Sequence, residues 1–101
     1  MILYELYSPT CVPCKMLKPR LEDLKKEYPS LEVRYLNLME YVNRPLESVM
    51  EDENLPKAIR ENIDSIKGTP HVFLLDEEGN AVLNKHADFT ILQEIKAFLQ
   101  K

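Results

Sequence analysis

The two cysteines of the chain, Cys11 and Cys14, stand close together within the segment SPTCVPCKMLKP, residues 8–19. Two residues separate them, and a helix-like run follows. A Cys at a helix N-terminus lies where unpaired N–H groups and the helix dipole favour negative charge, so its thiol pKa falls. Cys11 is therefore the candidate nucleophile. Cys14, one turn further along the same side, could attack a mixed disulfide formed on Cys11.

Two other uses of such a pair are open. A structural disulfide across two intervening residues closes a very small loop and constrains the unfolded chain little. A tetrahedral zinc site needs about four ligands, and the chain adds only His71 and His86, at a spacing that matches no zinc-finger pattern. Redox chemistry is favoured over both, and we expect no metal site and no bound cofactor.

Composition limits the class of protein. The chain has 101 residues, of which 45% are hydrophobic and 30% charged, which predicts a single globular domain over 1–101. Its net charge of −4 provides no broad basic field for nucleic acid or an anionic membrane. No apolar run approaches the roughly 20 residues of a membrane helix, and the start MILYELYSPT does not look like a secretory signal. We expect a cytoplasmic monomer.

The elements that would position the thiols follow from hydrophobic periodicity. Alternating or continuous apolar runs predict strands over 2–7, 31–38, 71–75 and 81–86, with a hairpin turn at 76–80. Apolar residues three and four apart predict helices over 12–28 and 89–99. Residues 40–64 contain two short helical patterns with a break at Asn54–Pro56, and they form an extended helical connector. The order β-α-β-α-β-β-α indicates an α/β fold.

Two blocks of sequence carry a family resemblance. The run CVPCKMLKPRLEDLKKEY (11–28) resembles the active-site helix of thioredoxins, and SIKGTPHVFLLDEEGNAV (65–82) resembles the second block of that family. The resemblance implies a thioredoxin fold, in which helices flank both faces of a central four-stranded mixed sheet with strand order 2-1-3-4. It also implies a thiol-disulfide oxidoreductase that reduces protein disulfides, with Cys11 as the attacking thiol and Cys14 as the resolving one.

Further site residues follow from the same resemblance. Pro70 would be a cis proline facing the disulfide, and Thr69 would offer backbone hydrogen bonds to a bound substrate strand. Val12 and Pro13, between the thiols, would also contact the substrate. Glu5 lies where thioredoxins carry a buried acid that accepts or relays the proton of the resolving Cys. A carboxyl group in the apolar run ILYELY would have a raised pKa, unless Glu5 points outward from its strand.

Several positions depart from the family pattern. Thr10 replaces the usual aromatic residue, Val12 replaces a glycine, and Tyr35 stands where a lysine commonly pairs with the buried acid. The first strand begins almost at residue 2, a compactness similar to that of glutaredoxins. The electron donor could therefore be a thioredoxin reductase or glutathione. The alternatives are a glutaredoxin-like protein reduced by glutathione and a non-catalytic thioredoxin-fold module that binds a partner or carries a cluster.

Two surface expectations complete the analysis. Residues 40–64 hold seven acids and three bases, so their net charge of −4 equals that of the whole chain. Such a segment beside the substrate groove would steer a basic partner, although a solvated connector without a partner explains the charge equally simply. Met16, next to the second thiol in a helical apolar pattern, is expected to fill the core.

Overall fold

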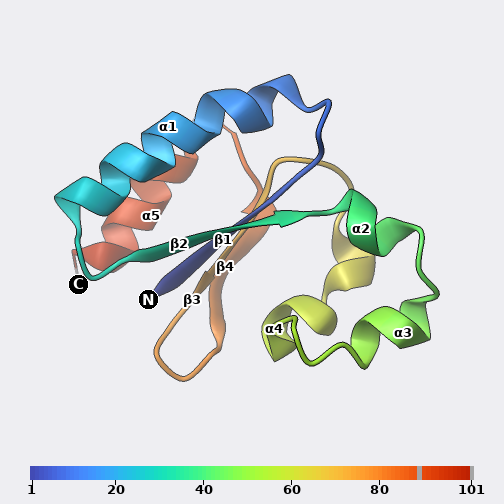
Figure 1. Cartoon of the computed structure of the whole chain (residues 1–101). Coiled ribbons are helices and arrows are strands. Elements are labelled where there is room, and N and C mark those ends of the chain that lie inside the picture. The colour runs from blue at the N-terminus through green and yellow to red at the C-terminus, as the bar shows by residue number, and fades with distance from the viewer. Residues whose placement is uncertain (89, 101) are drawn as a thin grey trace.

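A computed structural model describes residues 1–88 and 90–100 (Figure 1). Its strands are β1 (Ile2–Tyr7), β2 (Glu32–Asn37), β3 (His71–Leu75) and β4 (Ala81–His86). Its helices are α1 (Val12–Glu27), α2 (Met39–Val42), α3 (Leu46–Met50), α4 (Lys57–Arg60), the 3-10 helix η1 (Ile63–Ser65) and α5 (Ile91–Leu99). Residue 89, the predicted start of the last helix, lies outside the described residues. No helix in the described ranges is long and apolar enough to cross a membrane.

The four strands form one mixed sheet in the order β2-β1-β3-β4. β1 runs parallel to β2 and antiparallel to β3, and β4 returns antiparallel to β3 across the hairpin. Gly79 adopts φ +85 in that hairpin turn, a conformation that glycine tolerates best. The predicted four-stranded sheet and its order are confirmed. β1 and β3 are the two inner strands, and both are almost entirely buried.

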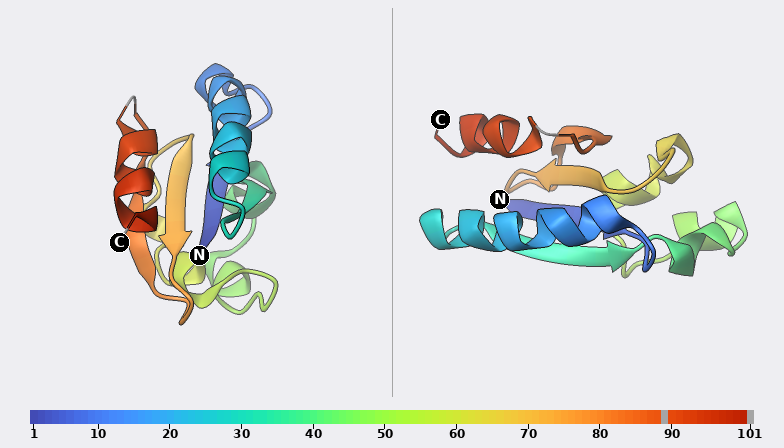
Figure 2. Two further views of the ribbon diagram at one scale, coloured as in Figure 1. Left: turned by 90° about the vertical axis from the view of Figure 1, so that its left-hand side faces the viewer. Right: turned by 90° about the horizontal axis from the view of Figure 1, so that it is seen from above.

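Each face of the sheet has its own hydrophobic core because alternate side chains of a strand point to opposite faces. On one face, Leu3 and Val72 pack with residues of α1 and α5. Figure 2 shows these two helices on the same side of the sheet. On the other face, Tyr4 and Phe73 pack with Ile59 of α4. Glu5 is two residues from Leu3 and therefore faces α1 rather than α4. The fold thus directs the one carboxyl group of β1 toward the helix that carries the thiols.

The connector between β2 and β3 is more finely divided than predicted. The break at Asn54–Pro56 is confirmed, with α3 before it and α4 after it. The expectation of only two short helices is wrong, because α2 and η1 are additional turns. Prolines directly precede α3 and α4, and each marks the point where its helix begins. At the start of α2, the side chain of Asn37 accepts a hydrogen bond from the N–H of Met39 at 3.0 Å, a local contact that periodicity does not reveal.

Docking of α1 on the sheet depends on Leu21, whose side chain has no exposed surface. We expect Leu21→Ala to lower the free energy of unfolding by about 2–4 kcal/mol, because it leaves a cavity beneath the active-site helix. Urea denaturation of the oxidised protein measures the change. Leu46→Ala is the matched control: Leu46 is 50% exposed, so its loss should change stability by less than about 0.5 kcal/mol. Equal effects of the two substitutions would contradict this account of the core.

Candidate active site

The two cysteines lie where β1 has ended and α1 begins, and they are joined as a disulfide with 5.3 Å between their Cα atoms. The intervening turn is held by a hydrogen bond from the N–H of Cys11 to the carbonyl of Ser8, at 3.1 Å. Cys11 is the N-cap of α1, and its Sγ accepts a hydrogen bond from the N–H of Cys14 at 3.2 Å. The sulfur of Cys11 therefore occupies the place that a capping oxygen takes in other helices.

The two sulfurs differ in their surroundings. Cys11 is 9% exposed and Cys14 is 3% exposed, so the first cysteine is the more accessible to a partner. The first turn of α1 contains no acidic residue, and it contains Lys15. In the reduced protein, a thiolate on Cys11 would gain the capping N–H group, the positive end of the helix and the nearby lysine charge. All three favour the anion.

The loop before β3 approaches the same turn. The Thr69–Pro70 peptide bond is cis, as the resemblance implied, and Pro70 is buried. The hydroxyl groups of Thr69 and Ser8 lie within hydrogen-bonding distance, 3.4 Å apart. The carbonyl of Pro70 accepts a hydrogen bond from the N–H of Ala87 at 2.9 Å, which attaches the loop to the end of β4. Residues far apart in sequence are thereby held beside the disulfide.

The apolar residues around the thiols are exposed. Val12 is 63% exposed, and Pro13 also faces solvent, as expected for residues that would contact a substrate. Met16 is 62% exposed, so the expectation that it fills the core is wrong. The buried face of α1 consists instead of Cys14, Leu17, Leu21 and Leu24. Sequence periodicity alone placed Met16 at the edge of the apolar face, and the structure turns it outward beside the active site.

Glu5 is buried, with 1% of its surface exposed, and the alternative of an outward-facing residue is excluded. Neither carboxylate oxygen has a hydrogen-bond partner among the described residues. Burial disfavours the charged form and raises the pKa of Glu5 from 4.5 to about 7, although the positive charge of Lys18 opposes the shift. Such a group can take up and release a proton near neutral pH.

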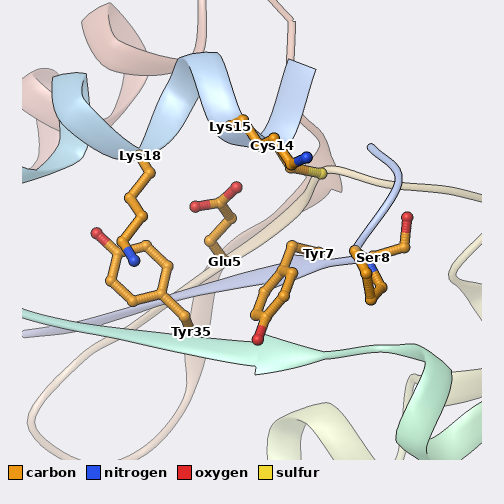
Figure 3. Close-up of a pocket in the computed structure, with 8 residues that line it drawn as sticks. Glu5, Tyr7, Ser8, Cys14, Lys15, Lys18 and Tyr35 are labelled. Atoms are coloured by element: carbon orange, nitrogen blue, oxygen red, sulfur yellow. The ribbon is translucent and has the colours of Figure 1, made fainter. Parts of the chain in front are cut away.

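A pocket of about 200 Å³ connects Glu5 with the second cysteine, and it is partly open to solvent. Figure 3 shows the carboxyl group of Glu5 directed toward α1, between Lys18 and Cys14. The volume exceeds the roughly 30 Å³ that one water molecule occupies in the liquid. The pocket therefore has room for water to reach both groups. Its lining residues are Glu5, Tyr7, Ser8, Pro9, Cys14, Lys15, Lys18 and Tyr35.

Lys18 and Tyr35 form one wall of this pocket. Tyr35 of β2 pairs with Glu5 of β1, so it lies next to the buried acid, where the family resemblance placed it. The ammonium group of Lys18 lies 4.9 Å from the centre of the Tyr35 ring, in a cation–π arrangement. Burial raises the pKa of Tyr35, and the negative charges of Glu22 and Glu5 raise it further. The phenol is therefore neutral at physiological pH, and the lysine supplies the positive charge from the helix.

Sequence reasoning did not assign Lys18 to the acid. The available signal was spacing: Lys18 follows Cys14 by four residues, one helical turn, and so lies on the same side of α1.

The histidines lie outside this pocket. His71 is buried beside Phe73, and its Nε2 lies 2.6 Å from Oδ1 of Asn84. Burial is the main cause that lowers the pKa of His71. His86 is exposed and pairs with His71 across the sheet. Among the described residues, no group of three or more His, Cys, Asp or Glu side chains is placed to hold a metal ion.

Comparisons with known proteins agree with this geometry. The thioredoxin family model matches residues 1–101. The chain is 31% identical over 80 residues to the thiol:disulfide interchange protein TxlA homolog of Synechocystis, a match that covers 79% of this chain but only 37% of that protein. Thioredoxin 1 of Thermosipho africanus superposes with a TM-score of 0.66 at 16% identity, covering 99% of this chain and 96% of that one. Spinach chloroplast thioredoxin f gives a TM-score of 0.64 at 20% identity, with coverage of 99% and 70%.

The raised pKa of Glu5 predicts a pH-dependent stability. The folded protein binds this proton more tightly than the unfolded chain, so the wild type loses stability as pH rises from about 4.5 to about 7. Glu5→Gln does not titrate. Its advantage over the wild type should grow across this window and level off above it, at a difference on the order of 2 kcal/mol. Urea denaturation of the oxidised wild type and Glu5→Gln proteins between pH 4 and 8 measures this difference in stability. A difference that does not change with pH would refute the raised pKa of Glu5.

Removing the positive charge of Lys18 should raise the pKa of Glu5 further, because that charge stabilises the carboxylate. Lys18→Met retains an unbranched side chain over Tyr35 and lacks the charge. Titration of the Glu5 carboxyl carbon by NMR, in the oxidised protein where neither cysteine titrates, measures the shift. Lys15→Met is the matched control, since Lys15 also lines the pocket but does not perturb Glu5. An unchanged Glu5 titration in Lys18→Met would show that the lysine does not act on the acid.

Proposed function

The chain belongs to the thioredoxin family, and from this premise we propose that it is a thiol-disulfide oxidoreductase that reduces disulfides of partner proteins through Cys11 and Cys14. The observation that carries the proposal is the Cys11–Cys14 disulfide at the N-terminus of α1, with the N–H of Cys14 donating to the sulfur of Cys11. The same hydrogen bond would stabilise the Cys11 thiolate once the pair is reduced.

The first step is attack on the partner. The reduced protein presents Cys11 as a thiolate, which attacks one sulfur of the partner's disulfide. The partner's S–S bond breaks as the mixed disulfide forms, and its other sulfur leaves as a thiolate that takes a proton. The greater exposure of Cys11 supports this assignment, since the partner's sulfur must approach it from solvent.

The second step releases the partner. Cys14 loses its proton and attacks the sulfur of Cys11, so the mixed disulfide breaks and the Cys11–Cys14 disulfide forms. Two electrons have then passed to the partner, whose second sulfur leaves and is protonated. Glu5 is proposed to accept or relay the proton of Cys14, because both groups line the same pocket and the pKa of Glu5 lies near 7.

The partner chain is proposed to lie across the surface formed by Val12, Pro13, Thr69 and Pro70. Val12 and Pro13 supply exposed apolar area next to the thiols. The Thr69–Pro70 loop is tied to the turn before Cys11 through Ser8. An extended segment of the partner could pair with the backbone of this loop, since main-chain hydrogen bonds recognise an extended chain independently of its sequence.

Reducing equivalents must come from a donor that regenerates the dithiol, and we propose a thioredoxin reductase or glutathione. The relative from Synechocystis is described as a thiol:disulfide interchange protein, which agrees with this class of reaction. The present chain spans 37% of that protein's length, so the proposed donor and partners rest on the family of this chain and on the chemistry of its dithiol. Incubation of the oxidised protein with thioredoxin reductase and NADPH, and separately with glutathione, distinguishes the two donors.

The asymmetry of the thiols predicts different behaviour of the two single mutants. Cys14→Ser should trap mixed disulfides with partner proteins, because Cys11 still attacks and nothing resolves the intermediate. Cys11→Ser should trap few or none, because the remaining thiol is 3% exposed. Non-reducing gel electrophoresis after incubation with a reducible protein such as insulin measures the trapped fraction. We expect at least a tenfold difference between the mutants, and equal trapping would overturn the assignment of roles.

A further inference from the structure

Exposed large apolar side chains occur in two places on the described surface. Val12 and Met16 lie beside the thiols, and the others are Met39, Val42, Leu46 and Met50 of α2 and α3, which are between 47% and 54% exposed. Met39 and Val42 are three residues apart in α2, and Leu46 and Met50 are four residues apart in α3, so each pair lies on one side of its own short helix. The described fold leaves about half of each of these side chains uncovered. We call residues 39–53 the α2–α3 face.

The α2–α3 face also carries an uncompensated negative charge. Arg44 is its single base against five acids. The guanidinium group of Arg44 is used internally: it lies 2.8 Å from Oδ2 of Asp52, and it also donates to the hydroxyl and carbonyl of Ser48. The remaining acids, Glu40, Glu47, Glu51 and Glu53, are exposed and make no ion pair with a described residue.

Neighbouring bases do not neutralise this charge. Lys57 of α4 pairs with Glu61 at 3.7 Å. Arg60 donates to the backbone carbonyl of Met50 at 3.4 Å. The hydrogen bond to a neutral carbonyl leaves the charge of Arg60 intact beside the α2–α3 face, where one base is outnumbered by four exposed glutamates. The acids around the apolar side chains are left available to an external cation.

The α2–α3 face lies at the same end of the sheet as the thiols. α1 begins and β2 ends at the same end of the sheet, and α2 and α3 lie at that end in Figures 1 and 2. The N–H of Leu38, the N-cap of α2, donates to the carbonyl of Tyr7 at 2.7 Å. Tyr7 also lines the pocket shared with Cys14. A protein bound at the disulfide would therefore have the α2–α3 face beside it.

We propose that the α2–α3 face is a docking surface for a basic, apolar segment of the protein that exchanges its disulfide with Cys11. The methionine, valine and leucine side chains would receive apolar side chains of that segment, and the four exposed glutamates would pair with its lysines or arginines. Methionine side chains adapt to differently shaped partners, which suits a surface that receives more than one sequence. The inference rests on the proposed function, and it adds the chemistry of the partner.

Charge argues against a second copy of this chain as the occupant. Pairing two α2–α3 faces about a two-fold axis would bring two sets of exposed glutamates together, and like charges in an interface oppose association. A basic partner is instead attracted by the exposed glutamates, and this attraction accelerates its association with the protein at low ionic strength. The apolar side chains then add contact area that does not depend on salt.

The test uses synthetic peptides as probes. Each peptide contains one disulfide, with a fluorophore and a quencher on its two sides, followed by an amphipathic tail. One tail contains leucine and lysine, a second has glutamate in place of lysine, and a third has serine in place of leucine. Stopped-flow fluorescence gives the second-order rate constant for reduction by the pre-reduced protein at 20 mM and 500 mM salt. No electron donor is needed in this design.

We expect the Leu-Lys peptide to react about fivefold to tenfold faster than the Leu-Glu peptide at 20 mM salt, and less than about twofold faster at 500 mM. The triple variant Glu47→Gln, Glu51→Gln, Glu53→Gln should lose this preference. The double variant Val42→Ser, Leu46→Ser should lose the advantage of Leu-Lys over Ser-Lys tails. The control variant Glu77→Gln, Glu78→Gln, in the hairpin turn at the opposite end of the sheet, should behave as the wild type.

The outcomes separate this inference from the proposed function. A small aromatic disulfide without a tail should react equally with all variants, and failure of that reaction in the wild type would refute the proposed function. Fluorescence anisotropy with the tails alone then still measures docking directly. Equal rates and equal binding for all tails, or loss of the preference in the Glu77/Glu78 control, would overturn the docking surface. Concentration-dependent dimerisation abolished by Val42→Ser, Leu46→Ser would also overturn it, in favour of a second copy.

Discussion

The central strand β1 is the constraint on which the rest of the structure depends. It is hydrogen-bonded to β2 on one side and β3 on the other, and residues Leu3 to Leu6 are all buried. Its alternation decides that Glu5 faces α1, and a shift of pairing by one residue would turn this carboxyl group to the opposite core. The turn that leads to Cys11 begins where β1 ends. The last residue of β1, Tyr7, also fixes the start of α2, because its carbonyl accepts a hydrogen bond from the N–H of Leu38.

Burial of Glu5 has opposite effects on stability and on chemistry. An ionised carboxyl group without hydrogen-bond partners is unfavourable in a buried site, so the folded protein is weakened as Glu5 loses its proton. The same environment brings its pKa to about 7. Lys18 moderates the effect from the surface while its ammonium group rests on the ring of Tyr35. Such local cost at a functional group, compensated by the surrounding fold, is common in proteins that perform chemistry.

Much of the fold could be predicted from the sequence, because strong local patterns agreed with one another. The apolar run ILYELY, the amphipathic helix after Cys11 and the hairpin around Gly79 all lie where periodicity and turn residues placed them. Residues 38–65 were harder to interpret, since their helices are too short to show a period. Their boundaries depend on local contacts such as the one between Asn37 and Met39.

The site residues whose role depends on spacing in the sequence were predictable. The residues whose role depends on how α1 packs against the sheet were less predictable. The Cys-x-x-Cys spacing favoured a redox pair over the other uses, and the Cys11–Cys14 disulfide agrees with it. The burial of Glu5 was implied by the family resemblance and by the apolar residues around it, and the structure confirms it. Met16 was misjudged, and the contact between Lys18 and Tyr35 was not predicted, because a helical pattern with mixed residues does not determine which flank of the helix faces the sheet. Only the docking of α1 shows that Met16 points to solvent and that Lys18 reaches over Tyr35.

The placement of charge gives the molecule an electrical polarity. Residues 40–64 account for a net −4, and the remaining ten acids and ten bases of the chain cancel. The excess lies in residues 39–53, and α2 and α3 of that segment lie at the end of the sheet where α1 begins (Figure 1). Negative charge is therefore concentrated at that end of the molecule. In the field of a positively charged body, rotational diffusion would be biased so that the sulfur-bearing end turns toward that body before contact.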